Sequence, residues 1–122
     1  NDEKNNTDCI NCSNDLDWKF IATVKKSVED NMDNPSFNVD VLCNLLNMSR
    51  TSFYNKIKAL TDQAPADYIR LIRLKHAAQL LKEQKHTITE ISELTGFSDA
   101  KYFREVFKKH FNILKHSPFS LR

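Results

Sequence analysis

The sequence predicts an all-helical fold in which two helix-turn-helix subdomains are joined by a long central helix, about seven helices in total. Three observations support this fold class. The 122 residues include one Gly and three Pro, and 40% are apolar, which favours helices with few turns around a buried core. Apolar residues recur at helical intervals along most of the chain. One pattern of apolar residues and turn signals then occurs twice.

The N-terminal segment differs in composition from the rest of the chain. Residues 1–15 are rich in Asn, Asp, Ser and Lys and hold almost no apolar side chains, so burial cannot offset the entropy of ordering them. We therefore expect a flexible linker there, followed by a folded domain over residues 16–122. Its first helix should run from Leu16 to about Met32, where the segment around Pro35 ends it.

The internal repeat carries most of the information. Each copy contains a short helix, a tight turn and a longer helix. The copies are offset by 49 residues up to the turn and by 50 after it, so the second copy has one extra residue just after its turn. The equivalent positions are Val39, Leu42, Leu45, Met48, Phe53, Ile57 and Leu60, and Ile88, Ile91, Leu94, Phe97, Phe103, Phe107 and His110. We expect a first subdomain over residues 16–63 and a second over residues 86–122.

The second copy has clear signals for where its helices begin and end. Thr87 and Glu90 have the spacing of a capping box, which would start the short helix at Ile88. Gly96 stands where that helix must end in a left-handed residue. Ser98 is then expected to cap the longer helix.

The first copy uses different residues for the same signals. Asn47 stands in the place of the glycine, because Asn tolerates positive φ, and Ser49 is the equivalent cap. Between the copies, Pro65 suits the first turn of a linker helix over residues 64–84, whose apolar residues continue to about Lys82. From Pro65 to about Lys82 this helix would extend about 28 Å, and neighbouring major-groove segments on one face of DNA lie about 34 Å apart.

The charge is divided unevenly along the chain. Residues 1–48 hold four basic and nine acidic side chains, a net charge of −5, whereas residues 49–122 hold fourteen and seven, a net charge of +7. This asymmetry favours a polyanionic partner for the second part. No apolar run of about 20 residues and no secretory signal pattern occurs. We therefore expect a cytoplasmic domain that makes no membrane contact.

The longer helix of each copy has a polar face opposite its core side. On a helical wheel, the outward and flanking residues are Thr51, Tyr54, Asn55 and Lys58 in the first copy and Lys101, Arg104, Glu105 and Lys108 in the second. Asn can pair with adenine, Arg with guanine, and Glu with the cytosine amino group, while the Thr methyl group can meet that of thymine. These faces therefore suit the major groove of double-stranded DNA.

These features resemble the DNA-binding domain of the AraC/XylS family of bacterial transcription regulators, from Trp18 to about Arg122. The most specific matches are NMSRTSFY at 47–54, IRLIRLKHAA at 69–78 and ISELTGFSD at 91–99, continuing to residue 109. The resemblance implies a seven-helix monomer that places two recognition helices in successive major grooves and activates transcription by recruiting RNA polymerase. The implied base-reading residues are Thr51, Tyr54, Asn55, Ala100, Lys101, Arg104 and Glu105. Phosphate contacts are expected from Ser49, Arg50, Lys58, Ser98, Lys108 and Lys109.

Within that family, the chain looks like the C-terminal output domain of a Bacteroides-type hybrid two-component regulator. Upstream sensor, kinase and receiver domains would then control it, and the domain would be the cytoplasmic part of a membrane-anchored sensor. The sequence departs from the family near its end, where the three extra residues 114–116 precede Ser117-Pro118. The packing of the last helix is therefore not implied by the resemblance.

Other kinds of site have less support. Cys9 and Cys12 have the spacing of half a zinc site or a redox pair, but no second such pair follows, and we predict neither role. Cys43 is expected to be a small core residue. The four histidines, at 76, 86, 110 and 116, lack partners at catalytic spacing, so we expect no enzyme, metal or cofactor. The alternative to DNA binding is a helical adaptor that binds another protein, which would have no duplex affinity to titrate with salt.

Overall fold

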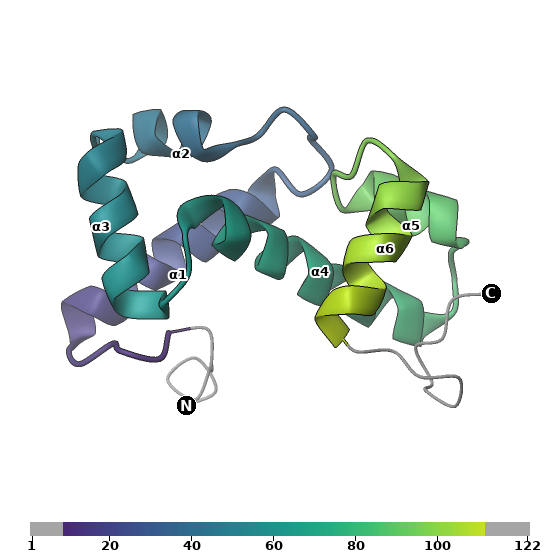
Figure 1. The fold of residues 1–122 in the computed structure, drawn as a ribbon, viewed down its shortest axis with the longest axis horizontal. Helices are drawn as coiled ribbons and strands as arrows, with labels where there is room; N and C mark the ends of the chain where they lie inside the picture. The colour runs from purple at the N-terminus through teal and green to yellow at the C-terminus, as the bar shows by residue number, and fades with distance from the viewer. Residues whose placement is uncertain (1–8, 112–122) are drawn as a thin grey trace. The chain divides into compact units, whose positions relative to one another are not determined.

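The computed structural model describes residues 9–111, and all regular secondary structure in that range is helical (Figure 1). The helices are α1 (Asp15–Asp30), α2 (Val39–Leu45), α3 (Arg50–Thr61), α4 (Pro65–Glu83), α5 (Ile88–Leu94) and α6 (Ala100–Phe111). The predicted all-α class is confirmed. The expected final helix and the three-residue insertion at 114–116 lie outside the described residues. Within the described range, no helix is long and apolar enough to cross a bilayer.

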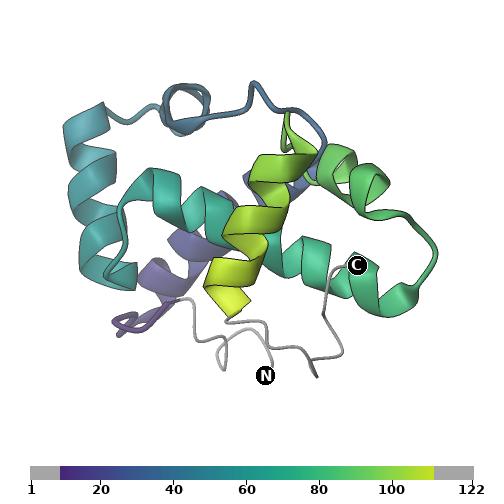
Figure 2. The ribbon, with the colours of Figure 1, turned by 45° about the vertical axis from the view of Figure 1, so that its right-hand side comes forward.

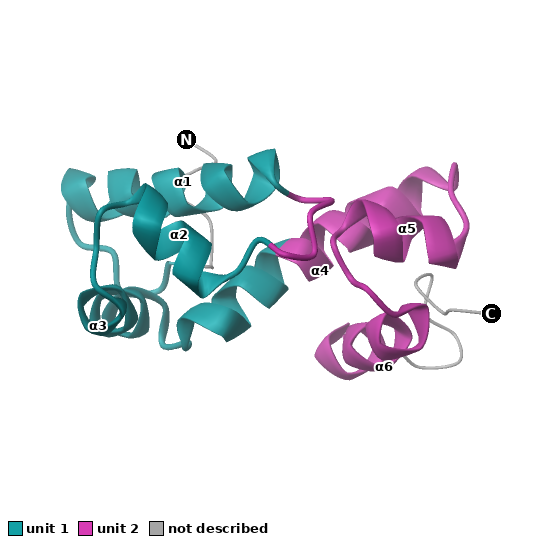
Figure 3. Cartoon of the chain, turned by 90° about the horizontal axis from the view of Figure 1, so that it is seen from above, with its two compact units in different colours: residues 1–31, 37–72 teal, residues 32–36, 73–122 magenta. Residues whose placement is uncertain are grey.

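The chain divides into two compact units, which Figure 3 colours separately. Unit 1 comprises residues 1–31 and 37–72, and unit 2 comprises residues 32–36 and 73–122. Helix α4 therefore contributes its first part to unit 1 and its second part to unit 2. Each unit holds one of the repeated helix pairs, α2 with α3 and α5 with α6.

Unit 1 forms around the apolar faces of α1, α3 and the first part of α4. Helix α1 begins after Asn14, whose side chain accepts a hydrogen bond from the backbone of Asp17 at 2.9 Å. Phe20 of α1 packs edge-on against Phe53 of α3, with 6.2 Å between ring centroids. The buried core residues include Ile21, Val24, Val28, Phe37, Leu42, Cys43, Phe53, Ile57, Leu60, Tyr68, Ile69, Leu71 and Ile72.

Unit 2 forms around Phe97 and three phenylalanines of α6, the helix drawn in yellow-green in Figure 2. The centroid distances are 5.1 Å from Phe97 to Phe103, 5.5 Å from Phe103 to Phe107, and 4.6 Å from Phe107 to Phe111. Tilted rings at these distances gain more than area burial alone. Buried Leu74, Ala77 and Ile91 complete this core. Helix α6 is thereby fixed with one apolar face inward and one polar face outward.

The segment before α1 differs from the expected flexible linker over its described part, residues 9–14. Cys9 is only 4% exposed and forms a disulfide with Cys12. Asn11, which lies between them, donates to the backbone carbonyls of Leu60 and Ala59 at 3.0 and 2.9 Å. The composition of the segment did not predict this because polar backbone and amide groups, rather than apolar side chains, make the contacts. The segment that carries the cysteine pair is therefore attached to the end of helix α3.

Candidate nucleic-acid interface

The turn of unit 1 has the conformation that its sequence predicts. Asn47 has φ of 54°, which confirms the left-handed residue at the end of α2. Met48 then donates its backbone N–H to the carbonyl of Cys43 at 3.0 Å. The Ser49 hydroxyl accepts from the backbone of Ser52 at 3.1 Å, which confirms it as the N-cap of α3. The turn and the cap together fix the direction in which α3 leaves α2.

The turn of unit 2 also follows its sequence signals up to Gly96. The predicted capping box is present, because Thr87 N–H donates to Glu90 Oε1 at 2.8 Å and Glu90 N–H donates to Thr87 Oγ1 at 3.1 Å. Gly96 has φ of 79°. Phe97 donates its backbone N–H to the carbonyl of Ser92 at 2.8 Å and so closes the end of the helix.

The expected cap of α6 was assigned one residue too early. Helix α6 begins at Ala100, and the carboxylate of Asp99, rather than the Ser98 hydroxyl, accepts from the backbone of Lys101 at 2.9 Å. The extra residue of the second copy lies here and moves the helix start along the chain. Asp is as effective as Ser at this position because its carboxylate also favours the positive end of the helix dipole.

A buried arginine that the sequence analysis did not single out supports the turn of unit 2. Arg73 of α4 is 6% exposed, and its Nη1 donates to the carbonyls of Met32 at 2.7 Å and Thr95 at 2.8 Å. Its Nη2 donates to the carbonyl of Asn34 at 3.0 Å. Burial lowers the pKa of the Arg73 guanidinium from its usual value. The Arg73 guanidinium thus links the loop at residues 32–34 to Thr95, the residue directly before Gly96.

Helix α3 presents the predicted polar face to solvent. The side chains of Thr51, Asn55 and Lys58 are exposed, and Tyr54 is 47% exposed. A cavity of about 370 Å³ adjoins this face, between α3 and the start of α4. Its lining residues are Val39, Arg50, Thr51, Tyr54, Asn55, Ala64, Pro65 and Ala66. Three predicted base-reading residues of the first copy, Thr51, Tyr54 and Asn55, thus surround one depression.

Arg50, a predicted phosphate contact, has an acidic neighbour. Its Nη1 lies 3.0 Å from Oδ1 of Asp40 in α2, and both side chains are exposed. An exposed pair of this kind contributes little to folding stability. It does partly neutralise Arg50, so a phosphate would have to compete with the Asp40 carboxylate.

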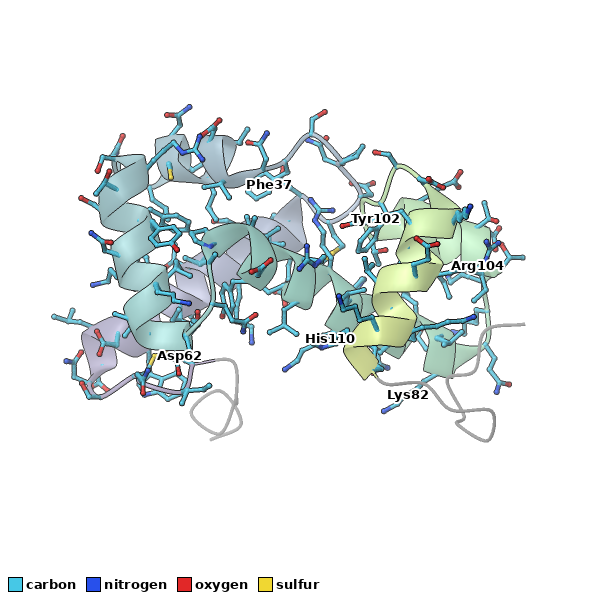
Figure 4. All side chains as sticks on the ribbon, in the orientation of Figure 1. Phe37, Asp62, Lys82, Tyr102, Arg104 and His110 are labelled. Carbon is cyan, nitrogen blue, oxygen red and sulfur yellow. A yellow bond between two sulfur atoms is a disulfide. The ribbon has the colours of Figure 1, made fainter. Side chains whose placement is uncertain are left out.

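Helix α6 presents the second predicted polar face. Lys101, Glu105, Lys108 and Lys109 are exposed, while Arg104 is half-buried. The labelled side chains of Tyr102 and Arg104 lie on opposite sides of the helix, as their spacing requires (Figure 4). The last turn of α6 carries the basic residues Lys108, Lys109 and His110. Ala100, at the start of the helix, is half-buried, and Ser98 is exposed in the turn before it.

Every residue that the sequence assigned to an interface lies on α3 or α6, or in the turn directly before one of them. Between residues 9 and 111, no cluster of three or more potential metal ligands occurs. The fold therefore offers two helix pairs, each with a fixed turn and an exposed polar second helix.

A family model described as a helix-turn-helix domain matches residues 42–114, which extend from α2 to beyond α6. The chain belongs to the AraC-type helix-turn-helix family. This membership confirms the family resemblance identified from the sequence.

The AraC-type domain has relatives among curated proteins. It is 45% identical over 97 residues to Histidine kinase P4 of Formosa agariphila, covering 80% of the chain and 7% of that protein. It is 32% identical over 99 residues to the Msm operon regulatory protein of Streptococcus mutans, covering 81% of the chain and 35% of that protein. It is 29% identical over 75 residues to the transcriptional activator RhaS of Escherichia coli, covering 62% of the chain and 27% of that protein. The chain thus spans only a minor part of each.

Two solved structures of response-regulator C-terminal domains are also similar to this chain. The C-terminal domain of the two-component response regulator yesN from Fusobacterium nucleatum matches with a TM-score of 0.70 and 26% identity, over 79% of this chain and 99% of that one. The C-terminal domain of AraT, a response regulator from Geobacillus stearothermophilus, matches with a TM-score of 0.70 at 23% identity, over 80% of this chain and 78% of that one, and shows a shared fold.

Proposed function

We propose that this AraC-type domain binds double-stranded DNA sequence-specifically as the output domain of a transcription activator. The main supporting observation is that both units pair a short helix with a second helix whose polar face is exposed, α3 in unit 1 and α6 in unit 2. In helix-turn-helix proteins the second helix of such a pair enters the major groove. We propose that α3 and α6 do so in successive grooves.

Base reading is assigned to the outward residues of the two helices. The Asn55 amide can accept a hydrogen bond from the adenine amino group and donate one to adenine N7. The Arg104 guanidinium can donate to both major-groove acceptors of guanine, O6 and N7. Glu105 can accept from the cytosine amino group, and the Thr51 methyl group can contact that of thymine. The full proposed set is Thr51, Tyr54, Asn55, Ala100, Lys101, Arg104 and Glu105.

Phosphate contacts would position the two helices without reading sequence. Basic residues near the edges of the polar faces suit this role, as do hydroxyls beside the helix starts. The proposed set is Ser49, Arg50, Lys58, Ser98, Lys108 and Lys109.

The longer relatives suggest what would surround this domain. Histidine kinase P4 and a response regulator are among the proteins that it resembles. We propose that upstream sensor, kinase and receiver domains control it and that RNA polymerase is its partner at promoters. A DNA target would place the domain in the cytoplasm, as part of a membrane-anchored sensor if the hybrid arrangement applies.

The decisive experiment is selection of binding sites from random duplexes, followed by affinity measurements on the selected site. Asn55→Ala and Arg104→Ala should each weaken binding to that site by about 1–3 kcal/mol and leave random duplexes unaffected. Lys109→Ala should weaken binding to all duplexes and flatten the salt dependence. Lys19→Ala, which changes an exposed lysine of α1, is the matched control and should have little effect.

Two outcomes would contradict the proposal. Footprinting that protects only one groove segment would mean that one unit alone reads DNA. Absence of duplex affinity at any salt concentration would instead favour a protein-binding adaptor, for which exposed Tyr54 offers a contact residue.

A further inference from the structure

The N-terminal cysteine pair lies against the end of the proposed recognition helix α3. Besides its bonds to Leu60 and Ala59, Asn11 places its Nδ2 3.4 Å from Oδ1 of Asp62. Figure 4 labels Asp62 at the end of α3, next to the segment that carries the disulfide. All of these residues belong to unit 1.

These contacts satisfy groups that a helix cannot satisfy by itself. The last four carbonyls of an α-helix have no partner within it, and those of Ala59 and Leu60 belong to this set because α3 ends at Thr61. Asp62 follows with φ of 61° and donates its N–H to the Lys58 carbonyl at 2.9 Å. Asn11 therefore acts as an external cap on the last turn of α3.

We propose that Cys9 and Cys12 form a thiol–disulfide switch that adjusts the affinity of α3 for DNA, the oxidised form binding more tightly. This inference rests on the proposed DNA-binding function. The disulfide closes a small ring through Ile10 and Asn11 and so restricts the backbone that presents the Asn11 amide. Reduction opens the ring, and the freed segment must then lose conformational entropy to make the same bonds.

Cys12 is the more exposed cysteine of the pair, and the exchange reaction starts there. Cys9 is buried and Cys12 is half-buried, so the thiolate of a dithiol reductant would attack Cys12 Sγ. The Cys12–Cys9 bond breaks, Cys9 leaves as a thiolate, and a mixed disulfide forms between Cys12 and the reductant. The second thiol of the reductant then displaces Cys12, and both protein thiolates take up protons. Two electrons pass from the dithiol, which becomes a disulfide.

The third cysteine does not compete in this exchange. Cys43 is buried in α2, and burial, followed by the nearby Asp40 charge, raises the pKa of its thiol. It therefore remains protonated and poorly nucleophilic.

The position of the cap determines which DNA contacts would respond. Lys58, a proposed phosphate contact, lies in the last part of α3, and its Nζ donates to the Asp62 carbonyl at 3.3 Å. Thr51 and Asn55 lie earlier in the helix. Loosening of the last turn should therefore weaken binding to every duplex without changing base preference. If one or two capping hydrogen bonds are lost, the affinity for duplex DNA should fall by about three- to tenfold.

The test compares the oxidised domain with the same domain reduced by dithiothreitol. Affinities are measured on the selected site and on random duplexes, and hydrogen exchange is followed at the amides of Asn11 and Asp62. Reduction should weaken both affinities by about three- to tenfold and speed exchange at Asn11. The Cys9→Ser and Cys12→Ser double variant should match the reduced domain with or without reductant, whereas Cys43→Ala should still switch.

The outcomes separate the switch from the proposed function. Duplex binding that is equal in both redox forms, or unchanged exchange at Asn11, overturns the switch alone. Failure of both forms to bind any duplex contradicts the proposed function and, with it, the switch.

Discussion

The turns at Asn47 and Gly96 differ in how much space they leave for a side chain. Exchanging the residue types at these two positions would measure that difference. Gly96 has φ of 79° and Asn47 has φ of 54°, so both positions need a residue that accepts the left-handed region. Because Asn does so at small cost, Gly96→Asn and Asn47→Gly leave the backbone requirement almost unchanged. Any large effect must therefore come from the side chain itself.

The structure leaves no room for a side chain at Gly96. A Cβ there would lie 2.6 Å from both the Met32 carbonyl oxygen and Arg73 Cζ, and nearer still to Arg73 Nη1. Arg73 cannot move freely, because this Nη1 donates to the carbonyls of both Met32 and Thr95. Displacing it would lose two charge-assisted hydrogen bonds, each worth about 1.5–3 kcal/mol. We expect Gly96→Asn to lower the free energy of unfolding by about 3–5 kcal/mol.

Urea denaturation followed by circular dichroism would measure the effect. Asn47→Gly is the matched control and should change the free energy of unfolding by less than about 1 kcal/mol. Double-variant analysis with Arg73→Met tests the mechanism, because the cost of Gly96→Asn should shrink once the guanidinium is gone. Equal costs for the two turn variants would refute the argument from space, and an undiminished cost in the Arg73→Met background would show that Arg73 is not the obstacle.

Three further predictions concern single contacts. Arg73→Met leaves buried carbonyls unsatisfied and should cost about 3–5 kcal/mol in the same denaturation assay; a cost below 1 kcal/mol would show that the three bonds are dispensable. Thr87→Ala removes the capping box of α5 and should lower the free energy of unfolding by about 1 kcal/mol in that assay, whereas Thr89→Ala, which changes an exposed residue two positions along the chain, should cost much less. Asp40→Asn releases Arg50 and should strengthen binding to all duplexes by about two- to fivefold at low salt, with a steeper salt dependence; a gain confined to the selected site would contradict this reason.

Local signals in the sequence were sufficient for the fold and for the two polar faces. Helix ends are set by residues within one turn, so Asn47, Ser49 and the Thr87–Glu90 pair could be identified directly. The helical wheel placed Thr51 and Asn55 outward because Phe53 determines which side of α3 is buried. Such features depend on neighbours in sequence, which a single chain displays in full.

Contacts between distant segments could not be predicted in this way. Leu45 and Leu94 occupy equivalent apolar positions, yet they are 58% and 39% exposed, and each is the last residue of a helix of only seven residues. Asn11 caps α3 by donating to the carbonyl of Ala59, which lies 48 positions further along the chain. Nothing in the composition of the first segment indicates which helix end it meets.

Arg73 makes such distant contacts, and they restrict which residue can stand at position 96. The guanidinium has a planar set of donors that can reach three carbonyls on two separate loops, whereas a lysine has one ammonium group with three donors at a single point. Because its Nη1 occupies the space beside residue 96, only a residue without a Cβ fits there. In the first copy, the side chain of Asn47 is exposed to solvent, so that turn accepts a residue with a Cβ. The difference between Asn47 and Gly96 therefore follows from how each unit is packed, and it requires no difference in what the two recognition helices read.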